Sequence, residues 1–443
     1  MSEWKKVKIG DICRIVKGTT GIAGAEPGEY PLVVTAEKRK TCSTYQFDQE
    51  AVCIPLVSSS GHGKKSLKNV HYQSGKFALG TILCAVIPNN PEQLDARFLH
   101  QYLQFYKDTL LVPLMKGAAN VSLSMKDIAT VEIPLPPIEK QRELSSLFIT
   151  LRENQKKLVA ESEKQLEYTK LLRQNILQDA IEGKITAGWR KSHPVIKGNP
   201  DYDAEALFKK IQKEKNCFNA ANKIKNKNSS IIQSNEVSLI INDNWIWIRG
   251  EDCFNIRSAA RIHQSDWKTS GIPFFRGREL VQLSKYGKVI NPETYISENF
   301  YQELKEKFGI PSKNDILVSA VGTLGRVYIV KENDKFYYKD AYILCFENYH
   351  KLNPNYFKMV ISSPYYQKEI YKESKGTTVA QFTIGRAKYI PIPLPPLKEQ
   401  EEIVAKVEIL LAKVTELENQ IQERKILSEK LAFGIIKEKL EEK

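Results

Sequence analysis

The sequence contains the stretch Ile133-Pro-Leu-Pro-Pro-Ile-Glu-Lys-Gln141 and repeats it as Ile392-Pro-Leu-Pro-Pro-Leu-Lys-Glu-Gln400, 259 residues further along the chain. The same offset pairs Gly117 with Gly376 before the motif, and it continues without gaps for several helical turns after it. A long-period repeat of this kind indicates that one structural unit occurs twice.

A shorter match marks the start of each half of the chain. Trp4-x-x-Val7 corresponds to Trp245-x-x-Ile248, now at an offset of 241, so the globular parts differ by an insertion. A chain of 443 residues is also too long for one hydrophobic core. The predicted order is a first globular domain at 1–137, a first helix at 138–182, a basic connector at 183–243, a second globular domain at 244–396 and a second helix at 397–443.

Both segments that follow the proline motifs have the apolar spacing of long helices. Apolar residues recur in alternating steps of four and three, the heptad spacing that keeps one stripe against a partner helix. Pro136-Pro137 and Pro395-Pro396 fix the two helix starts, because proline cannot continue a helix backward, and Gly183 is a plausible stop for the first. The stripe, called here the predicted seam, consists of Leu144, Phe148, Leu151, Leu158, Leu172, Ile176, Ile403, Val407, Leu410, Val414, Leu417, Ile421, Leu431 and Ile435.

The orientation of the two helices stays open on spacing alone. Each helix has about 45 residues, far more than the ~11–12 residues of a typical globular helix. At a rise of 1.5 Å per residue it is roughly 65 Å long. Ordinary core packing would explain one such helix, but two copies in one phase favour an intramolecular coiled coil. Antiparallel pairing would place the globular domains at opposite ends and parallel pairing at one end, and the connector is long enough for either.

The two globular stretches have the composition of mixed α/β domains with many short strands. Apolar runs rich in β-branched and aromatic residues predict strands at Ile82–Ile87, Ile316–Val321, Arg326–Val330 and Tyr342–Phe346. Aromatic and aliphatic residues at helical spacing predict short helices at Asp95–Tyr106 and Pro354–Tyr366. Away from their ends the two stretches differ in sequence, as two domains that read different targets would.

The net charge of +14 points to a polyanionic partner, and its distribution is informative. The net charge is +4 for residues 1–137, +5 for 183–243 and +7 for 244–396, but 0 for 138–182 and −2 for 397–443. The positive excess therefore lies in the globular domains and the connector, and the helices carry none of it.

The cysteine pattern and the hydropathy predict a reduced, cytoplasmic protein. The seven cysteines are scattered, lie mostly in apolar runs and never form a Cys-x-x-Cys pair, so a structural zinc site is not expected. We expect no signal peptide and no membrane association, because the chain lacks an apolar stretch of ~20 residues and its start, MSEWKKVKIG, is polar.

Basic and polar residues in predicted loops are the candidates for contact with double-stranded DNA. Lysines suit phosphate contacts, which position a protein without reading sequence, and arginines suit bidentate contacts with guanine. The candidates in the first domain are Lys38, Arg39, Lys40, Lys64, Lys65, Lys68, Lys116, Asn120 and Ser122. Those in the second are Arg257, Arg261, Arg276, Arg278, Lys285, Arg326, Lys375, Thr377 and Gln381.

Two loops deserve more weight than the single charges. Lys116–Ser122 and Lys375–Gln381 match at the repeat offset, and each combines a cation, a glycine and hydrogen-bonding side chains. For any one lysine or arginine, a solvated surface charge is the simpler interpretation. The set as a whole carries the hypothesis of DNA binding.

Motifs of catalytic chemistry are absent from the sequence. Gly61-His-Gly-Lys64 lacks the spacing of a nucleotide-binding loop, and Gly322-Thr-Leu-Gly325 lacks the third glycine of a dinucleotide turn. Ser363-Pro-Tyr-Tyr366 and Asn353-Pro-Asn-Tyr356 each miss the second proline of an amino-methyltransferase motif. No histidine pair has the spacing of metal ligands, and we predict no catalytic residue and no metal site.

The ordered set of motifs resembles the specificity subunits of type I restriction-modification systems. The resemblance covers essentially the whole length: the opening from Trp4 to Ile12, the loops at Gly117 and Gly376, both proline motifs and both helices. The segment Gly183-Lys-Ile-Thr-Ala-Gly-Trp-Arg190 is similar as well. One departure is Gly250-Glu-Asp-Cys253, where the first copy has Ile9-Gly-Asp-Ile12, which leaves the local register in doubt.

The resemblance implies an α+β architecture of two globular target recognition domains separated by two long antiparallel helices that form an intramolecular coiled coil. Each domain would read one half of an asymmetric, interrupted DNA site, and the helices would set the gap. Two methyltransferase subunits would bind this chain and methylate adenine N6, and two motor-nuclease subunits could join for restriction, a prokaryotic host defence. S-adenosylmethionine, Mg²⁺ and ATP would bind these partners, and the chain itself would bind no cofactor and catalyse no reaction.

Two other functions remain open at this stage. The basic charge alone would also suit a stand-alone DNA methyltransferase or nuclease with an unrecognised site. The neutral helices alone would suit a coiled-coil scaffold without a DNA role.

Overall fold

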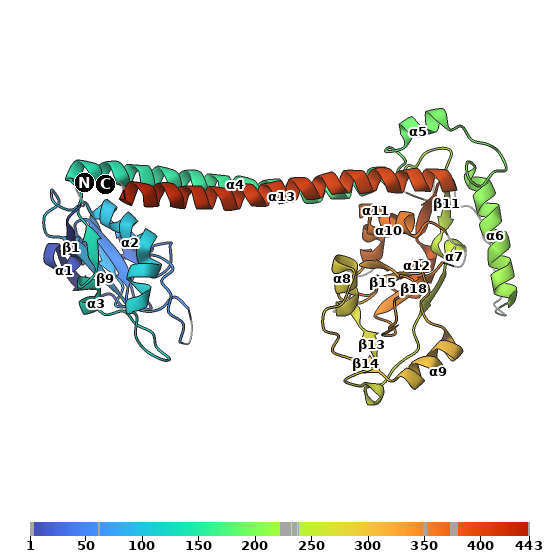
Figure 1. Cartoon of the computed structure of the whole chain (residues 1–443), viewed down its shortest axis with the longest axis horizontal. Helices are drawn as coiled ribbons and strands as arrows, with labels where there is room; N and C mark the ends of the chain where they lie inside the picture. Colours follow the sequence, from blue (N-terminus) through green and yellow to red (C-terminus); the bar gives the residue numbers. More distant parts are fainter. Residues whose placement is uncertain are drawn as a thin grey trace. The chain divides into compact units, whose positions relative to one another are not determined.

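The structure, a computed structural model, describes residues 4–60, 63–221, 232, 237, 239–348, 352–372 and 380–441. The chain forms two compact units, shown in Figure 1. Unit 1 comprises Met1–Glu163 and Gln422–Lys443, and unit 2 comprises Lys164–Ile421. Each of the two long helices therefore contributes one segment to each unit.

Unit 1 contains two four-stranded sheets and a short ribbon. Its strands are β1 (Lys6–Lys8), β2 (Cys13–Lys17), β3 (Tyr30–Val33), β4 (Lys40–Cys42), β5 (Phe47–Asp48), β6 (Ala51–Pro55), β7 (His71–Gln73), β8 (Lys76–Leu79), β9 (Leu83–Pro88) and β10 (Glu132–Pro134). The antiparallel sheet has the order β2-β9-β6-β7, and the second sheet, β4-β3-β8-β5, includes one parallel pair, β3 with β8. The ribbon pairs β1 with β10.

Unit 2 repeats the antiparallel sheet and the ribbon with different side chains, and its second sheet has three strands in place of four. Its strands are β11 (Ile246–Arg249), β12 (Asn255–Ser258), β13 (Ile272–Phe275), β14 (Tyr295–Ile296), β15 (Ile316–Ser319), β16 (Val327–Ile329), β17 (Tyr337–Tyr338), β18 (Ile343–Glu347) and β19 (Pro391–Leu394). The antiparallel sheet has the order β12-β18-β15-β16, and β14-β13-β17 again includes one parallel pair. Val7 faces Ile133 in the first ribbon, and Ile248 faces Ile392 in the second, the same pair at the two repeat offsets.

The shorter helices follow the same duplication only in part. Those of unit 1 are α1 (Ile9–Ile12), α2 (Ala96–Leu110), the 3₁₀ turn η1 (Val112–Leu114) and α3 (Met125–Ala129). Those of unit 2 are α5 (Ala187–Ser192), α6 (Ala204–Ala221), α7 (Gly250–Cys253), η3 (Gln264–Asp266), α8 (Gly277–Tyr286), α9 (Glu298–Phe308), α10 (Pro354–Ser362), α11 (Pro364–Tyr371) and α12 (Ile384–Tyr389). The register doubt at Gly250 is resolved, because α7 starts 241 residues after α1.

The predicted short elements agree with the structure except at one helix. β9, β15, β16 and β18 lie where strands were predicted. The predicted helix Pro354–Tyr366 is instead two helices, because Pro364 cannot donate a backbone hydrogen bond inside a helix. Ser363 ends α10 and caps α11, with its hydroxyl accepting a hydrogen bond from the Tyr366 amide at 3.3 Å.

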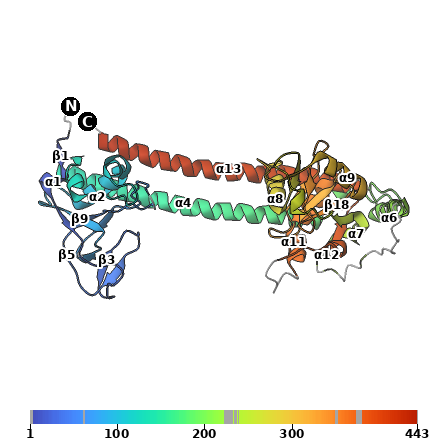
Figure 2. The same ribbon diagram turned by 90° about the horizontal axis from the view of Figure 1, so that it is seen from below.

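Alternation along the central strands builds a core on each face of the antiparallel sheet. In β6, Val52 and Ile54 join the core under α2, while Cys53 faces a second core with Phe77. Helix α2 packs on β6 and β7, and Figure 2 shows α2 beside β9 of the same sheet. β15 does the same in unit 2, where alternate residues also join two separate cores.

The two long helices are α4 (Ile138–Ile181) and α13 (Leu397–Glu441). In unit 2, Arg173 of α4 donates to the Glu418 carboxylate of α13 at 2.8 Å, and Thr186, just after α4, donates to Glu399 at 2.7 Å. In unit 1, Lys425 lies 3.9 Å from Glu163. In unit 2, residue numbers rise along α4 as those of their partners fall along α13, so the two segments run antiparallel there.

The predicted seam is only partly buried. Leu144, Phe148, Ile176, Ile403, Val407, Val414 and Ile421 are buried, and Leu151, Leu158, Leu410 and Ile435 are partly buried. The other three are exposed, Leu172 and Leu417 at 43% and Leu431 at 65%, so their assignment to the seam is wrong. A straight α-helix drifts about 20° per heptad from a 3.5-residue repeat, which turns a strict heptad stripe toward solvent.

The predicted connector contains two helices that pack within unit 2. Leu207, Phe208 and Ile211 of α6 lie in the core of unit 2. Lys215 of the same helix forms a buried ion pair with Asp252 of α7 at 3.1 Å. The basic composition of this segment led to the prediction of a connector, whereas the segment is part of the folded unit 2.

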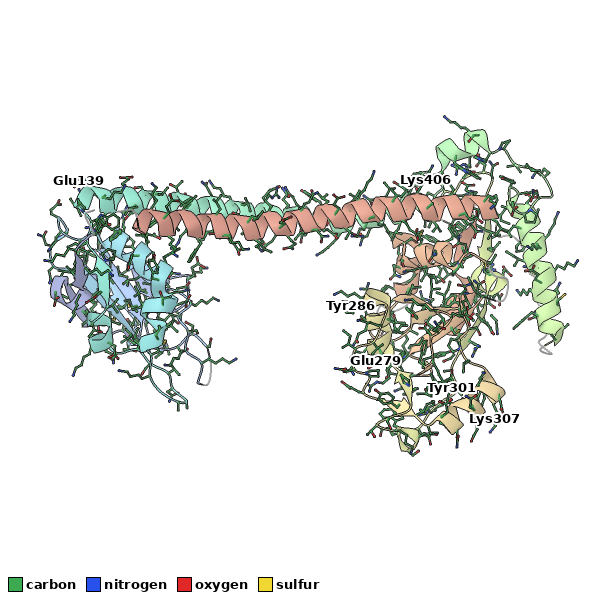
Figure 3. The ribbon with its side chains drawn as sticks, viewed as in Figure 1. Glu139, Glu279, Tyr286, Tyr301, Lys307 and Lys406 are labelled. Atoms are coloured by element: carbon green, nitrogen blue, oxygen red, sulfur yellow. The ribbon has the colours of Figure 1, made fainter. Side chains whose placement is uncertain are left out.

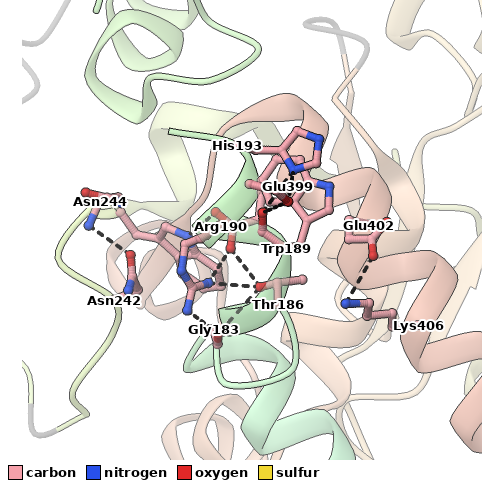
Figure 4. Close-up of polar contacts among 12 residues, drawn as sticks. Gly183, Thr186, Trp189, Arg190, His193, Asn242, Asn244, Glu399, Glu402 and Lys406 are labelled. Carbon is pink, nitrogen blue, oxygen red and sulfur yellow. Dashed lines mark hydrogen bonds and ion pairs between the residues drawn. The ribbon is translucent and has the colours of Figure 1, made fainter. Parts of the chain in front are cut away.

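A buried polar network fixes the end of α4 to the start of α13 (Figure 4). The helix ends at Ile181, before Gly183 with a φ of +78°, which suits a left-handed cap. The Glu399 carboxylate accepts hydrogen bonds from Thr186 Oγ1 at 2.7 Å and Trp245 Nε1 at 2.8 Å, and it pairs with Arg190. Arg190 also donates to the Gly183 carbonyl oxygen at 2.6 Å. The network explains why Gly183–Arg190 accompanies the second proline motif.

Candidate nucleic-acid interface

In unit 1, two predicted loops are joined side by side by their backbones. The Leu123 amide donates to the Leu56 carbonyl oxygen at 2.9 Å, and Ser58 donates to Val121 at 3.0 Å. Lys116 and Ser122 exchange two backbone hydrogen bonds of 2.8 Å. This paired-loop surface brings the exposed candidates together on adjacent loops: Lys64, Lys65, Lys116, Asn120 and Ser122.

Gly117 is required by the shape of this loop. Its φ is +120°, and a Cβ at this position would lie 2.2 Å from the carbonyl oxygen of Asn120. A side chain therefore cannot be accommodated without moving the backbone. Lys116, beside it, is mostly exposed and lies 3.1 Å from Asp127.

Unit 2 has the same loop anchor at the repeat offset. The Phe382 amide donates to the Ala320 carbonyl oxygen at 2.9 Å, as Leu123 does to Leu56, and Gln381 forms a bridge with Val321. Gln381 occupies the position of Ser122 in the repeat and is exposed. Two further predicted contacts, Lys375 and Thr377, lie outside the described residues.

Two open pockets flank this anchor in unit 2. The first, called the α8 pocket, has a volume of about 1010 Å³ and is lined by Arg276, Arg278, Gln282, Lys285, Tyr286, Thr323 and Tyr342 among others. The second, called the Arg261 pocket, has a volume of about 580 Å³ and includes Ser258, Arg261, Asp340, Ala341, Gln381 and Thr383. Five of the predicted contacts, Arg261, Arg276, Arg278, Lys285 and Gln381, therefore line two adjacent hollows.

Helix α8 carries most of the charge of the α8 pocket. Figure 3 labels Glu279 near its start and Tyr286 at its end. Arg278 lies 2.7 Å from Glu293 and 3.0 Å from Glu279. Burial disfavours the Glu279 carboxylate, but the Arg276 amide and the two guanidinium groups outweigh it and lower the pKa. The arginines are thus held in place by acids, as side chains that read bases need to be.

Two predicted DNA contacts are better explained as structural. Arg39 donates to Gln73 Oε1 and to the carbonyl oxygens of Glu37 and Tyr72. Arg257 donates to the carbonyl oxygens of Phe308 at 3.2 Å and Ile310 at 3.4 Å. Because these guanidinium groups are half-buried and engaged within the domain, we correct both assignments.

The remaining candidates lie on the surface, outside the pockets described for the two units. Lys38, Lys40, Lys68 and Arg326 are exposed, and Lys40 reaches the Ile22 carbonyl oxygen at 3.5 Å. Their placement permits phosphate contact.

Sequence reasoning missed a polar pocket in unit 1 of about 520 Å³, lined by Arg39, His71, His100, Arg152 and Lys156 among others. Burial, with help from the Arg39 charge, lowers the pKa of His71 to about 4. Burial also lowers the pKa of His100 to about 4, and Arg152 adds to the effect. The pocket draws on β7, α2 and α4, so no local motif could have revealed it.

No group of three or more His, Cys, Asp or Glu side chains suited to a metal ion occurs among the described residues. Within those same ranges, none of the helices has the length and apolar character needed to cross a membrane.

The chain is similar to known proteins over most of its length. Residues 1–168 and 242–424 match the family described as "Type I restriction modification DNA specificity domain". The chain is 26% identical over 369 residues to a protein of Haemophilus influenzae named putative type I restriction enzyme specificity subunit S.HindORF215P. The aligned region spans 83% of this chain and 76% of that protein.

Two solved structures share the fold. One is the HsdS subunit from Thermoanaerobacter tengcongensis, with a TM-score of 0.57, 16% identity and coverage of 100% of this chain and 97% of that chain. The other comes from work on the complex assembly and conformational transition of the type I R-M system, with a TM-score of 0.65, 15% identity and coverage of 99% and 98%. By the family match over its two halves, the chain belongs to the type I restriction-modification DNA specificity family.

Proposed function

We propose that the chain is the DNA sequence-recognition subunit of a type I restriction-modification complex, and that each unit reads one half of a bipartite, asymmetric DNA site. The observation that supports this most is the repeated loop anchor, Leu123 on Leu56 and Phe382 on Ala320. Each anchor displays exposed basic or polar residues, while the sheets behind the two anchors share one topology. One scaffold thus presents two different chemical surfaces, as two unlike half-sites require.

We further propose that the chain performs no catalysis. Two methyltransferase subunits would supply adenine-N6 methylation with S-adenosylmethionine, and motor-nuclease subunits using Mg²⁺ and ATP would supply restriction. The two long helices would serve as a spacer that sets the gap between half-sites. Catalysis by partner subunits alone suits a chain whose sequence lacks catalytic motifs.

The test uses the purified full chain with and without type I modification subunits. The chain alone should transfer no methyl group from S-adenosylmethionine to DNA, and the assembled complex should methylate one bipartite motif. Affinity for random DNA should fall steeply between about 50 and 200 mM salt, because phosphate contacts release counterions. Methylation by the isolated chain would refute the proposal, and so would DNA binding that salt leaves unchanged.

Insertion of four residues after Leu158 tests the spacer. The new complex should methylate a motif with the same half-sequences and a changed gap, or lose activity altogether. Altered half-sequences at an unchanged gap would contradict the role of the helices.

A further inference from the structure

A strained turn lies between the two pockets of unit 2. Ala341 has a φ of +59°, which side-chain-bearing residues rarely adopt, and the Tyr342 amide donates to the Asp340 carbonyl oxygen at 2.7 Å. A hydrogen bond between residues i and i+2 about a positive φ is typical of the strained γ-turn. Strain of this type persists only where neighbours hold it, and it is concentrated at functional sites.

The neighbours of the turn hold it from both sides. The Ala341 amide donates to Ser258 Oγ at 2.9 Å. Lys339 donates its amide to Phe275 at 2.8 Å, and the Tyr342 carbonyl oxygen accepts from Ala320 at 2.8 Å. The turn is therefore tied to β12, β13 and the loop anchor, and it is a fixed feature of the surface.

The first and last residues of the turn are polar, and they line different pockets. Asp340 lines the Arg261 pocket and Tyr342 lines the α8 pocket. Tyr342 is 38% exposed, with the Lys339 ammonium 4.2 Å from the centre of its ring. Asp340 has no ion-pair or side-chain hydrogen-bond partner within the described parts of the chain, although Arg261 lines the same pocket.

The negative charge of the Asp340 carboxylate is unusual among the residues that line the two pockets. Among the described residues that line the two pockets, Asp340 is the one that carries a negative charge. A carboxylate on a surface that binds a polyanion opposes binding, and a hydrogen bond from a base can offset this cost where the carboxylate pairs with no cation of the protein. Asp and Glu accept from the N4 amino group of cytosine, and Arg donates to O6 and N7 of guanine, both in the major groove.

We propose that Asp340 is a specificity-determining residue that accepts a hydrogen bond from cytosine N4 in the half-site read by unit 2, with Arg261 beside it on the paired guanine. The inference rests on the proposed function and adds the base pair that one pocket selects. Among the described residues no ion pair joins Asp340 to Arg261, so each side chain can bind its own base.

The experiment compares the motifs methylated by complexes that contain wild-type, D340A or D340N chains, by methylome sequencing of a host strain. The wild-type motif should contain a G·C pair in one half-site. D340A should relax that single position. Methylation of sites that carry one of the three other base pairs there should rise by roughly tenfold relative to wild type. D340N keeps the shape but adds an amide donor, which suits adenine, so it should admit an A·T pair at the same position even if D340A lowers the amount of folded chain.

D243A is the matched control, because Asp243 is an exposed aspartate of unit 2 outside both pockets. Its motif should be identical to that of the wild type. If D340A and D340N retain every position of the wild-type motif, or relax only the half-site read by unit 1, the assignment of Asp340 is wrong while the proposed function stands. If the wild-type complex yields no bipartite motif at all, the proposed function itself fails.

Discussion

The indole Nε1 of Trp245 donates a hydrogen bond to the buried carboxylate of Glu399, 2.8 Å away and 154 residues later in the sequence. Glu399 stands at the position that Lys140 occupies in the first copy of the motif, where the side chain is partly exposed and pairs with Glu143. The two copies of the repeat thus differ at the residue that fixes the end of α4.

E399A should destabilise unit 2 by about 3–5 kcal/mol, because it leaves the Arg190 charge buried and unpaired. Four of the five tryptophans lie in unit 2, so urea unfolding followed by tryptophan fluorescence reports this unit. K140A is the matched control and should change stability by less than about 1 kcal/mol, since exposed ion pairs contribute little. Equal effects of the two variants would contradict the role of the network.

The double variant K64A/K116A should weaken DNA binding of the full chain without changing its preferred half-sites. If each lysine contacts one phosphate, the slope of log affinity against log salt should fall by about 0.9 per lysine. Mobility-shift titrations at several salt concentrations measure this. K126A, an exposed lysine on α3, should leave the slope unchanged, and a lost half-site preference would show that the lysines read bases.

R257A should lower stability, in contrast to a DNA-contact variant. The loss of hydrogen bonds to Phe308 and Ile310 should reduce the free energy of unfolding by about 1–3 kcal/mol. R326A removes an exposed arginine and should leave stability nearly unchanged. A stable R257A chain with reduced affinity for DNA would restore the original assignment.

Stability should fall as the pH drops from about 6.5 toward 4. His71 and His100 have pKa values of about 4 in the folded chain, whereas an unfolded histidine titrates near 6.5. Between these values the unfolded state binds more protons, so ΔG of unfolding rises with pH, by about 1.4 kcal/mol for each unit of pKa difference and each histidine.

The double variant H71Q/H100Q should reduce this pH dependence in urea titrations at pH 5 and pH 7. H263Q, at an exposed position of unit 2, should retain the wild-type dependence. An undiminished dependence in the double variant would show that the unit 1 pocket is not its source.

The repeat made the duplicated architecture predictable, because proline motifs, apolar runs and the opening tryptophans are local signals. The strands around Leu83 and Ile316 and the end of α4 before Gly183 followed from residue type alone. The exposure of Leu431 could not be foreseen, since a heptad in sequence does not state how far a helix turns before it leaves its partner.

The candidate site was predicted less well, for a physical reason. Whether an arginine faces solvent depends on carbonyl groups far away in sequence, such as those of Phe308 and Ile310 for Arg257. Arg278 and Arg257 look alike in the sequence, yet one lines an open pocket and the other lies half-buried within the domain. Asp340 was not among the predicted contacts, because a search for basic residues passes over an acidic side chain that lies between them.

The loop anchors join main-chain atoms only, from Leu123 to Leu56 and from Phe382 to Ala320. No particular amino acid is needed to keep such a hydrogen bond, so natural variation can replace the neighbouring side chains while the frame persists. Point mutations at the loop surface can therefore change the base preference for one half-site at a time, while the fold of the protein stays the same.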